Sequence, residues 1–138
     1  MKTRMLLLCL LTIAGLAGLA ASSPAVAHHS FAAMYDANKP ITLKGAVTKI
    51  EWTNPHARFY VDVKDDKGTV TNWNLELASP NVLTRQGWSR KSLNVGDVIT
   101  VEGSLAKDGS KMANARVVTL ASGKRVFAGS SGGDGPAQ

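Results

Sequence analysis

Cysteine is almost absent from this chain of 138 residues, because the only one, Cys9, lies in an apolar run near the amino terminus. A single cysteine forms no disulfide within its own chain and supplies no cluster of thiolates for a metal. Cys9 also lies too early in the chain to be the lipid-bearing residue of a lipoprotein. We therefore expect neither cysteine chemistry nor a stabilising disulfide in the folded part of the protein.

Long apolar runs are equally scarce, and the one from Met5 to Ala20 is placed as in a secretory signal. Lys2 and Arg4 precede it, and Ala25-Val26-Ala27 follows with the small-x-small pattern of a signal-peptidase site. The run is too short, and too clearly followed by that site, to favour a membrane anchor. We predict a signal peptide over residues 1–27, a periplasmic location, and no membrane span after processing.

Acidic residues are few, since 10 Asp and Glu stand against 16 Lys and Arg, and the net charge is +6. The predicted signal peptide holds two of the basic residues and no acidic one, so processing lowers the charge to +4. This charge suits a soluble protein near anionic envelope surfaces and is no strong argument for nucleic acid. Export argues against a nucleic-acid partner more directly.

Apolar and polar residues alternate with a period of two over much of the remaining chain, which predicts β-strands. Ser79 can cap a short helix, Pro80 suits its first position, and Gly87 suits its end, so we expect this helix over residues 80–86. The five predicted strands span residues 41–52, 56–64, 69–78, 98–107 and 112–120.

This order of elements predicts an all-β fold with one short helix. Three strands, a helix and two more strands is the order of the OB-fold, a small five-stranded Greek-key barrel. The apolar phase of the first strand changes beside Gly45, which predicts a bulge or bend of the kind that a small barrel needs in order to close. A β-sandwich and an open α+β sheet remain as alternatives.

The predicted domain boundaries follow from these elements. A polar and aromatic lead-in without clear periodicity precedes the first strand, and a short edge segment is expected over residues 123–127. The carboxyl-terminal residues are rich in Gly and Ser, so we expect them to be disordered. The chain therefore divides into a signal peptide (1–27), a lead-in (28–40), an OB-like barrel domain (41–127) and a tail (128–138).

Cleavage after Ala27 would make His28 the first residue of the processed chain. Its free α-amino group and its imidazole Nδ1 can then chelate one metal ion, and a third nitrogen would complete the arrangement called a histidine brace. Amine and imidazole donors in a tetragonal arrangement favour Cu(II). The only other histidines are His29 and His56, so we predict a copper or other divalent metal site formed by His28, His29 and His56. The alternative is that the two terminal histidines are solvated and that His56 bonds to nearby backbone.

The segment between the first two predicted strands contains a second candidate site, formed by Trp52 and Asn54. In OB-folds this connection borders the usual ligand surface. Trp52 could stack on a sugar or an aromatic ligand, or it could simply pack at the barrel mouth; Trp73 is expected in the core and Trp88 at the barrel end. A second set of polar residues lines the strands that follow, either as a hydrogen-bonding groove or as an ordinary wetted face: Arg58, Tyr60, Asp62, Asn72, Asn74 and Glu76.

No motif of a hydrolase or a nucleotide enzyme is present. The pattern G-x-S-x-G occurs at residues 129–133, but it lies in the tail without the strand and helix that a nucleophile elbow needs. We therefore expect a binding protein for a metal ion or a small envelope ligand, with copper-dependent oxidation as the less favoured reading. The competing hypothesis is a metal-independent OB-fold adaptor that binds a glycan, a peptide or an envelope protein.

Several short segments together resemble an uncharacterised family of small exported bacterial proteins, classed as a domain of unknown function. The resemblance implies a periplasmic, single-domain, mostly β protein, and it brings no activity or ligand. A looser similarity, in architecture and export only, is to periplasmic bacterial OB-fold proteins. The segments that carry the family resemblance are His28-His29-Ser30-Phe31, Tyr35-Asp36, Trp52-Thr53-Asn54-Pro55-His56, Trp73, Gly87-Trp88, Gly96-Asp97 and Val101-Glu102-Gly103.

Overall fold

The computed structural model describes residues 29–129, and of His29 and Ser30 only the backbone. The predicted signal peptide, His28 and all but the first two residues of the predicted tail lie outside the described residues. The described elements, in chain order, are α2 (His29–Met34), β1 (Tyr35–Glu51), β2 (Arg58–Lys64), β3 (Val70–Glu76), α3 (Pro80–Arg85), β4 (Val98–Ala106), β5 (Met112–Thr119) and β6 (Arg125–Phe127).

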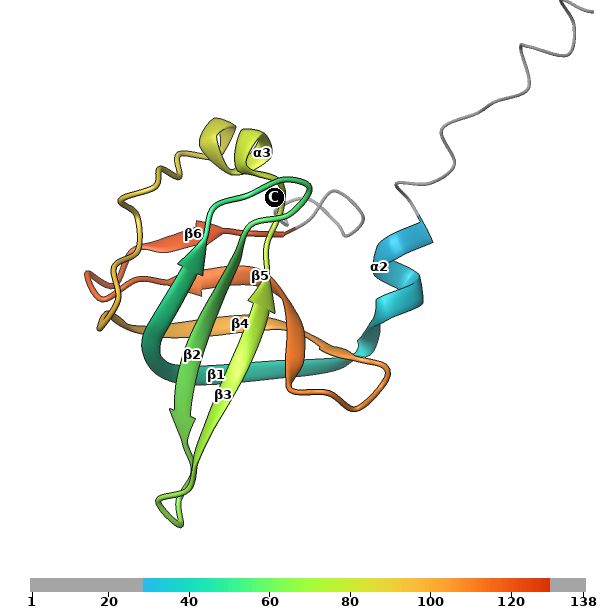
Figure 1. Cartoon of the computed structure of the whole chain (residues 1–138), viewed down its shortest axis with the longest axis vertical. Coiled ribbons are helices and arrows are strands. Elements are labelled where there is room, and N and C mark those ends of the chain that lie inside the picture. Colours follow the sequence, from blue (N-terminus) through green and yellow to red (C-terminus); the bar gives the residue numbers. More distant parts are fainter. Residues whose placement is uncertain (1–28, 130–138) are drawn as a thin grey trace, which may run out of the picture.

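The strands form one sheet that closes on itself (Figure 1). Its order is β3-β2-β1-β4-β5-β6, all neighbours are antiparallel, and a parallel pairing of β3 with β5 joins the two ends of the five-stranded part. In the five-stranded part, two strands lie on either side of β1, and the sheet closes between β3 and β5. With a helix after β3, this arrangement is a five-stranded Greek-key barrel of the OB type. The predicted fold class is confirmed, and β6 extends the sheet beyond the closed barrel.

The interior of the barrel is filled by the apolar phase of the alternating strands. Phe59 and Val61 on β2 and Leu75 on β3 are almost completely buried, while their polar neighbours in sequence point outward. Trp88 closes one end, where its indole nitrogen donates a hydrogen bond to the Phe127 carbonyl at 2.7 Å. Half-buried Trp73 packs against the same core. Period-two alternation therefore identified the core face of these strands correctly.

Strand β1 bends strongly, and Gly45 lies where the neighbouring strand approaches most closely. A Cβ atom at Gly45 would collide with the backbone carbonyl of Asp62 on β2. The pairing of β1 with β2 then shifts register between Val47 and Lys49, which is the irregularity that the change of phase predicted. Glycine is thus required here by the close approach of two backbones.

The first strand starts earlier than its alternation predicted, at Tyr35 instead of Ile41. The segment expected as an irregular lead-in is the helix α2 followed by the beginning of β1. The residues between Asp36 and Pro40 are largely exposed, and the pairing of β1 with β4 is irregular between Tyr35 and Pro40. A strand with little buried surface has no alternation of apolar and polar residues, so this part of β1 could not be predicted from periodicity.

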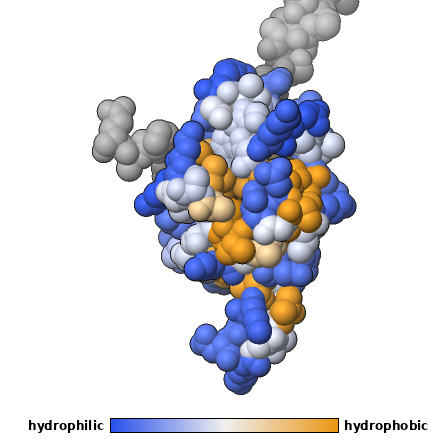
Figure 2. All heavy atoms as spheres, turned by 90° about the vertical axis from the view of Figure 1, so that its left-hand side faces the viewer, coloured by the Kyte–Doolittle hydropathy of each residue, from blue (hydrophilic) through white to orange (hydrophobic). Residues whose placement is uncertain are grey.

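Apolar side chains also gather on the surface that lies away from α2, on the left of Figure 1 (Figure 2). Three valines are more than half exposed, namely Val70, Val95 and Val98, at 55%, 68% and 52%. Within residues 29–129 there is no helix with the length and apolar character to cross a bilayer.

Candidate functional site

A polar cluster lies on the outer surface of the barrel, over the paired ends of β2 and β3. Arg58 and Glu76 are directly opposite each other in the antiparallel register, next to the buried pair Phe59 and Leu75. Because successive side chains of a strand point to opposite faces, burial of Phe59 and Leu75 directs Arg58 and Glu76 outward. The same alternation directs Asn74 to the outer face.

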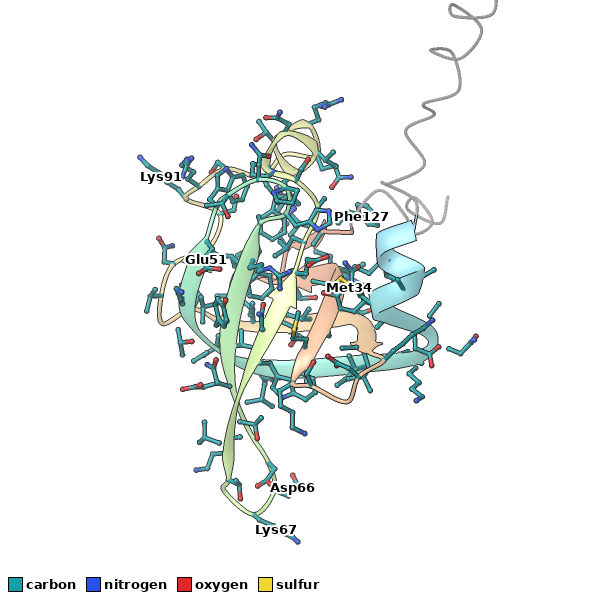
Figure 3. The ribbon with its side chains drawn as sticks, turned by 45° about the vertical axis from the view of Figure 1, so that its right-hand side comes forward. Met34, Glu51, Asp66, Lys67, Lys91 and Phe127 are labelled. Atoms are coloured by element: carbon teal, nitrogen blue, oxygen red, sulfur yellow. The ribbon has the colours of Figure 1, made fainter. Side chains whose placement is uncertain are left out.

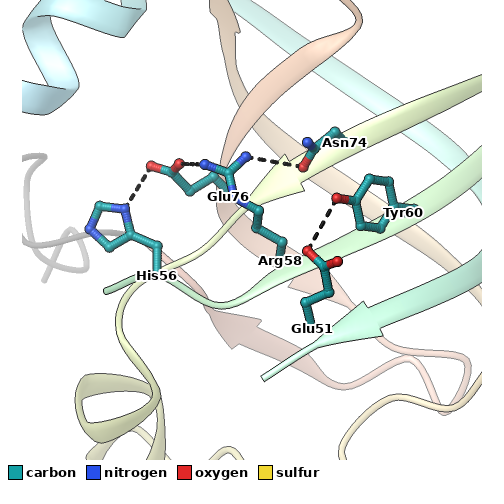
Figure 4. Close-up of polar contacts among 6 residues, drawn as sticks. All are labelled: Glu51, His56, Arg58, Tyr60, Asn74 and Glu76. Carbon is teal, nitrogen blue, oxygen red and sulfur yellow. Dashed lines mark hydrogen bonds and ion pairs between the residues drawn. The ribbon is translucent and has the colours of Figure 1, made fainter. Parts of the chain in front are cut away.

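Glu76 is the centre of this cluster, and it is only 4% exposed (Figure 4). One carboxylate oxygen accepts a hydrogen bond from the Arg58 guanidinium, and the other lies 2.9 Å from Nδ1 of His56. Arg58 also donates to Oδ1 of Asn74 at 3.2 Å. A buried carboxylate is stable only when paired and hydrogen-bonded, and these contacts satisfy both conditions.

The contact with Glu76 determines which nitrogen of His56 is available. A carboxylate oxygen can only accept, so the hydrogen atom of this contact is on Nδ1. In the neutral ring Nε2 then carries the lone pair. The side chain is 27% exposed, which leaves the ring accessible at the edge of the cluster. His56 is therefore oriented by a carboxylate on one side and can bind through Nε2 on the other.

Tyr35 covers the cluster from the amino-terminal side. It is the first residue of β1, its side chain is 1% exposed, and its hydroxyl faces Glu76 and Arg58. The hydroxyl is near enough for electrostatic interaction with both groups, but it makes no hydrogen bond of normal geometry within the described part of the chain. Burial, and next the negative charge of Glu76, raise the pKa of Tyr35 far above its ordinary value, so the phenol stays neutral.

The helix that precedes Tyr35 is attached to the hairpin between β4 and β5. The backbone N–H of Lys107 donates to the Met34 carbonyl at 2.9 Å, and the Lys107 ammonium group donates to the Ala32 carbonyl at 2.5 Å. The rings of Phe31 and Tyr35 also pack together, with centroids 5.7 Å apart. These contacts fix α2 beside the strand that carries Tyr35.

The remaining polar residues of β2 and β3 largely satisfy one another. Tyr60 donates to Glu51 at 3.2 Å, and the ammonium of Lys49 lies 2.5 Å from the same carboxylate, where its hydrogen bond lowers the pKa of Glu51. Asn72 donates to Asp62 at 2.7 Å and to the Thr48 hydroxyl at 3.1 Å. This pattern fits a wetted outer face better than a groove that lacks partners.

Trp52, predicted as a stacking platform, is partly buried and packs against the core. Together with Ile50, Trp88 and other residues, it borders a small pocket. The volume of this pocket is about 10 Å³. A cavity of this size holds about one water molecule. Asn54 is exposed and is not part of the pocket wall. The geometry therefore fits the packing alternative for Trp52, and the structure does not bring Trp52 and Asn54 together in a ligand site.

Of the three predicted metal ligands, the structure describes the side chain of His56 alone. His28 and the side chain of His29 lie outside the described residues. Within the described part there is no group of three or more His, Cys, Asp or Glu side chains arranged to hold a metal. The sequence pattern placed Glu76 on the polar face but did not predict its burial, and it assigned Tyr35 no role in a site. The position of Asn54-Pro55-His56 just before β2 was the one sequence signal that pointed to this site. Its buried partner, Glu76, is brought to His56 only by the tertiary fold.

Comparison with known proteins gives a family but no activity. The model of a family of unknown function, DUF6152, matches residues 17–115. No curated protein matches the chain. Among solved structures, the chain is similar to the mitochondrial single-stranded DNA-binding protein Rim1 of S. cerevisiae, with 10% identity, a TM-score of 0.47, and coverage of 59% of this chain and 92% of that one. It is also similar to the N-terminal domain of the PriB protein of Thermoanaerobacter tencongensis, with 20% identity, a TM-score of 0.41, and coverage of 60% and 96%.

Proposed function

This chain belongs to DUF6152, a family of unknown function, and we propose that it is a periplasmic binding protein that holds Cu(II) between its processed amino terminus and His56. The donors are the α-amino group and Nδ1 of His28, the imidazole of His29, and Nε2 of His56. The single observation that carries the proposal is the 2.9 Å contact of His56 Nδ1 with the buried carboxylate of Glu76.

That contact is typical of metal sites. A histidine that binds a metal through one nitrogen usually donates the N–H of the other nitrogen to a carboxylate or a carbonyl, which fixes the ring and makes it more basic. Glu76 supplies this carboxylate, and Arg58 pairs with its second oxygen. His56 is thereby oriented with Nε2 on the side of the ring away from Glu76, from which the neutral ring can bind a divalent metal.

The path of the amino-terminal segment also supports the proposal. Helix α2 begins at His29, and Tyr35 follows its last residue. Because a helix rises 1.5 Å per residue, the backbone of His29 lies about 9 Å along the chain axis from Tyr35. The Tyr35 hydroxyl faces Glu76, whose other neighbour is His56. The backbone of His29 is thus only a short helix away, along the chain, from the residue whose hydroxyl faces Glu76.

The chemistry of this donor set favours Cu(II). All the donors are nitrogen atoms, and imidazole and amine nitrogens in a tetragonal arrangement select Cu(II) among the common first-row ions. The described part of the chain contains no cluster of carboxylates of the kind that Ca²⁺ or Mg²⁺ needs. With no activity assigned to the family, sequestration or delivery of the metal is the role that this site supports.

The test compares the mature protein beginning at His28 with a version that retains Ala27 before it. The extra residue blocks the α-amino group of His28 and leaves every other donor unchanged. We expect Cu(II) to bind the mature protein at least about tenfold more tightly than the version that retains Ala27. The EPR spectrum of the mature complex should show one more nitrogen donor than that of the extended version.

Equal affinities and equal spectra for the two proteins would overturn the free-amine site. His56→Ala in the mature protein then tests the third ligand separately. If this variant alone loses affinity for Cu(II), His56 is a ligand and the α-amino group of His28 is not. Indifference of both proteins to Cu(II) and to chelators would favour the metal-independent adaptor instead.

A further inference from the structure

A groove with a volume of about 350 Å³ lies between α2 and the β4–β5 hairpin. The helix contributes Ala33 and Met34, and the hairpin contributes Ala106, Lys107, Asp108 and Met112. Met34 and Met112 are far apart in sequence, and the other two methionines of the chain, Met1 and Met5, lie in the predicted signal peptide. The fold therefore brings both methionines of the described part of the chain to one groove.

The two walls of the groove are held in place by the chain itself. Lys107 binds the carbonyls of both Ala32 and Met34, which fixes the end of the helix to the hairpin. Met112 is the first residue of β5 and is opposite Asn74 in the parallel pairing that closes the barrel. The methionine side chains are consequently the movable parts of an otherwise fixed groove.

Met34 is not an ordinary core residue, because 42% of its surface is exposed. Figure 3 shows its side chain extending from α2 on the side that faces the sheet. A methionine that only packed a helix onto a sheet would gain stability from complete burial. Partial exposure leaves part of the Met34 side chain accessible to solvent beside the groove that it lines.

We propose that this groove is a soft-metal site, in which the thioether sulfurs of Met34 and Met112 bind a monovalent ion of the Cu(I) class. Thioethers are soft, neutral ligands that select Cu(I) over hard cations. Methionine has three rotatable side-chain bonds, so both side chains can adjust their positions within the groove that they line. With no cysteine after residue 9, these two residues are the only sulfur donors that the processed chain has.

The other polar groups of the groove do not suit a hard cation. The Lys107 ammonium is positively charged and is bound to the Ala32 carbonyl. One oxygen of Asp108 accepts a hydrogen bond from the Ser110 backbone at 2.9 Å, within the turn of the hairpin. Ca²⁺ needs six or more oxygen ligands and Mg²⁺ needs octahedral oxygen geometry, and one carboxylate supplies neither. A monovalent soft ion bound by two neutral sulfurs needs no further protein charge.

This site uses no histidine, so it stands or falls independently of the proposed function. The probe is Ag(I), which has the ligand preferences of Cu(I) and does not change oxidation state in air. The protein is the mature chain with its methionine methyl groups labelled with ¹³C, and the variants are Met34→Leu and Met112→Leu. Leucine is similar to methionine in volume and is tolerated in its place.

We expect one equivalent of Ag(I) to shift the methyl resonances of both methionines, and each leucine variant to bind Ag(I) about tenfold more weakly or worse. His56→Ala should show the same Ag(I)-dependent shifts of the two methionine methyl resonances as the unaltered protein. Thermal unfolding of each variant in the absence of metal confirms that the fold is retained.

Methyl resonances that stay in place, or leucine variants that bind Ag(I) as tightly as the parent, would overturn the proposal. If Ag(I) binding is lost in His56→Ala but not in the leucine variants, the ion occupies the histidine site and the groove is not a metal site. Loss of Cu(II) binding on retention of Ala27, with Ag(I) binding unchanged, would show two separate sites.

Discussion

Nδ1 of His56 lies 2.9 Å from a carboxylate oxygen of Glu76, a residue that is 4% exposed and that also pairs with Arg58. The two residues are distant in sequence, and the contact joins the loop before β2 to the end of β3. It determines which nitrogen of His56 faces outward, and it stabilises a carboxylate that the barrel has largely removed from water. Stability and ligand binding can therefore be tested at the same residue.

Replacement of Glu76 by glutamine is expected to destabilise the fold. The change removes the charge that balances Arg58, which is itself only about one quarter exposed. Charged hydrogen bonds of this kind contribute roughly 1.5–3 kcal/mol each, so we expect a loss of about 2 kcal/mol in the free energy of unfolding by urea. Glu51→Gln is the matched control, because its side chain is 32% exposed, against 5% for that of Glu76, and should therefore matter less. Equal stability of the two variants would contradict the role given to Glu76.

The same Glu76→Gln protein should bind Cu(II) more weakly while the ligands remain the same. Loss of the carboxylate that orients a ligating histidine typically costs about 10- to 100-fold in metal affinity. Competition with a chelator of known affinity measures the loss, and the EPR spectrum should keep its number of nitrogen donors. A spectrum with one nitrogen fewer would mean that His56 had left the metal, and unchanged affinity would remove Glu76 from the site.

Stability at alkaline pH should depend on Tyr35. Burial and the nearby charge of Glu76 raise the pKa of Tyr35 in the folded protein, whereas in the unfolded chain the phenol ionises near pH 10. As the pH rises, Tyr35 therefore loses its proton first in the unfolded state. Its contribution to the free energy of unfolding is present below about pH 10 and is lost as the pH rises further. Urea midpoints should fall above that pH in the parent, and fall less in Tyr35→Phe. Parallel curves for the two proteins would contradict this assignment.

Tyr35→Phe should also be tolerated at neutral pH. The hydroxyl is buried without a hydrogen bond of normal geometry in the described part of the chain, so its removal relieves an unsatisfied group. We expect a change between zero and about 1 kcal/mol in favour of the folded state. Tyr35→Ala, which empties the space over Glu76, should cost about 3–5 kcal/mol by comparison. A strong destabilisation by phenylalanine would reveal a hydrogen bond that the structure does not contain.

Gly45→Ala should be among the most damaging small substitutions in the barrel. The added methyl group meets the Asp62 carbonyl of the neighbouring strand, which can move only if the pairing of β1 with β2 opens. Overpacking of this kind costs about 1–3 kcal/mol. Lys44→Ala, at the exposed position before it, is the control and should change stability little. Thermal unfolding of both variants measures the difference.

The fold could be predicted from the sequence because its core residues recur with the period of a strand. The alternation of apolar residues predicted both the strands and their buried face, as shown by Phe59 and Val61 on β2 and by Leu75 on β3. The sequence of three strands, a helix and two strands then favoured the barrel that the structure confirms. The start of β1 was missed because its first residues are exposed and carry no such alternation.

The candidate site was predictable only in part. His56 was identified by its residue type, but nothing in the sequence indicates that Glu76 is its partner or that Tyr35 covers both. Glu76 alternates with core residues as any exposed polar residue does, so this pattern could not predict its burial. Whether His28 and His29 bind a metal stays a prediction, since their side chains lie outside the described residues.

The attachment of α2 to Lys107 has a consequence for the order in which the protein is assembled. The carbonyls of Ala32 and Met34 are synthesised early, but the residue that binds them belongs to a hairpin made much later. Throughout that interval the nascent helix has no surface on which to dock, and a helix of six residues is not stable alone. The leading end of the described domain therefore settles only after the hairpin between β4 and β5 has formed, although it is the first part of that domain to be synthesised.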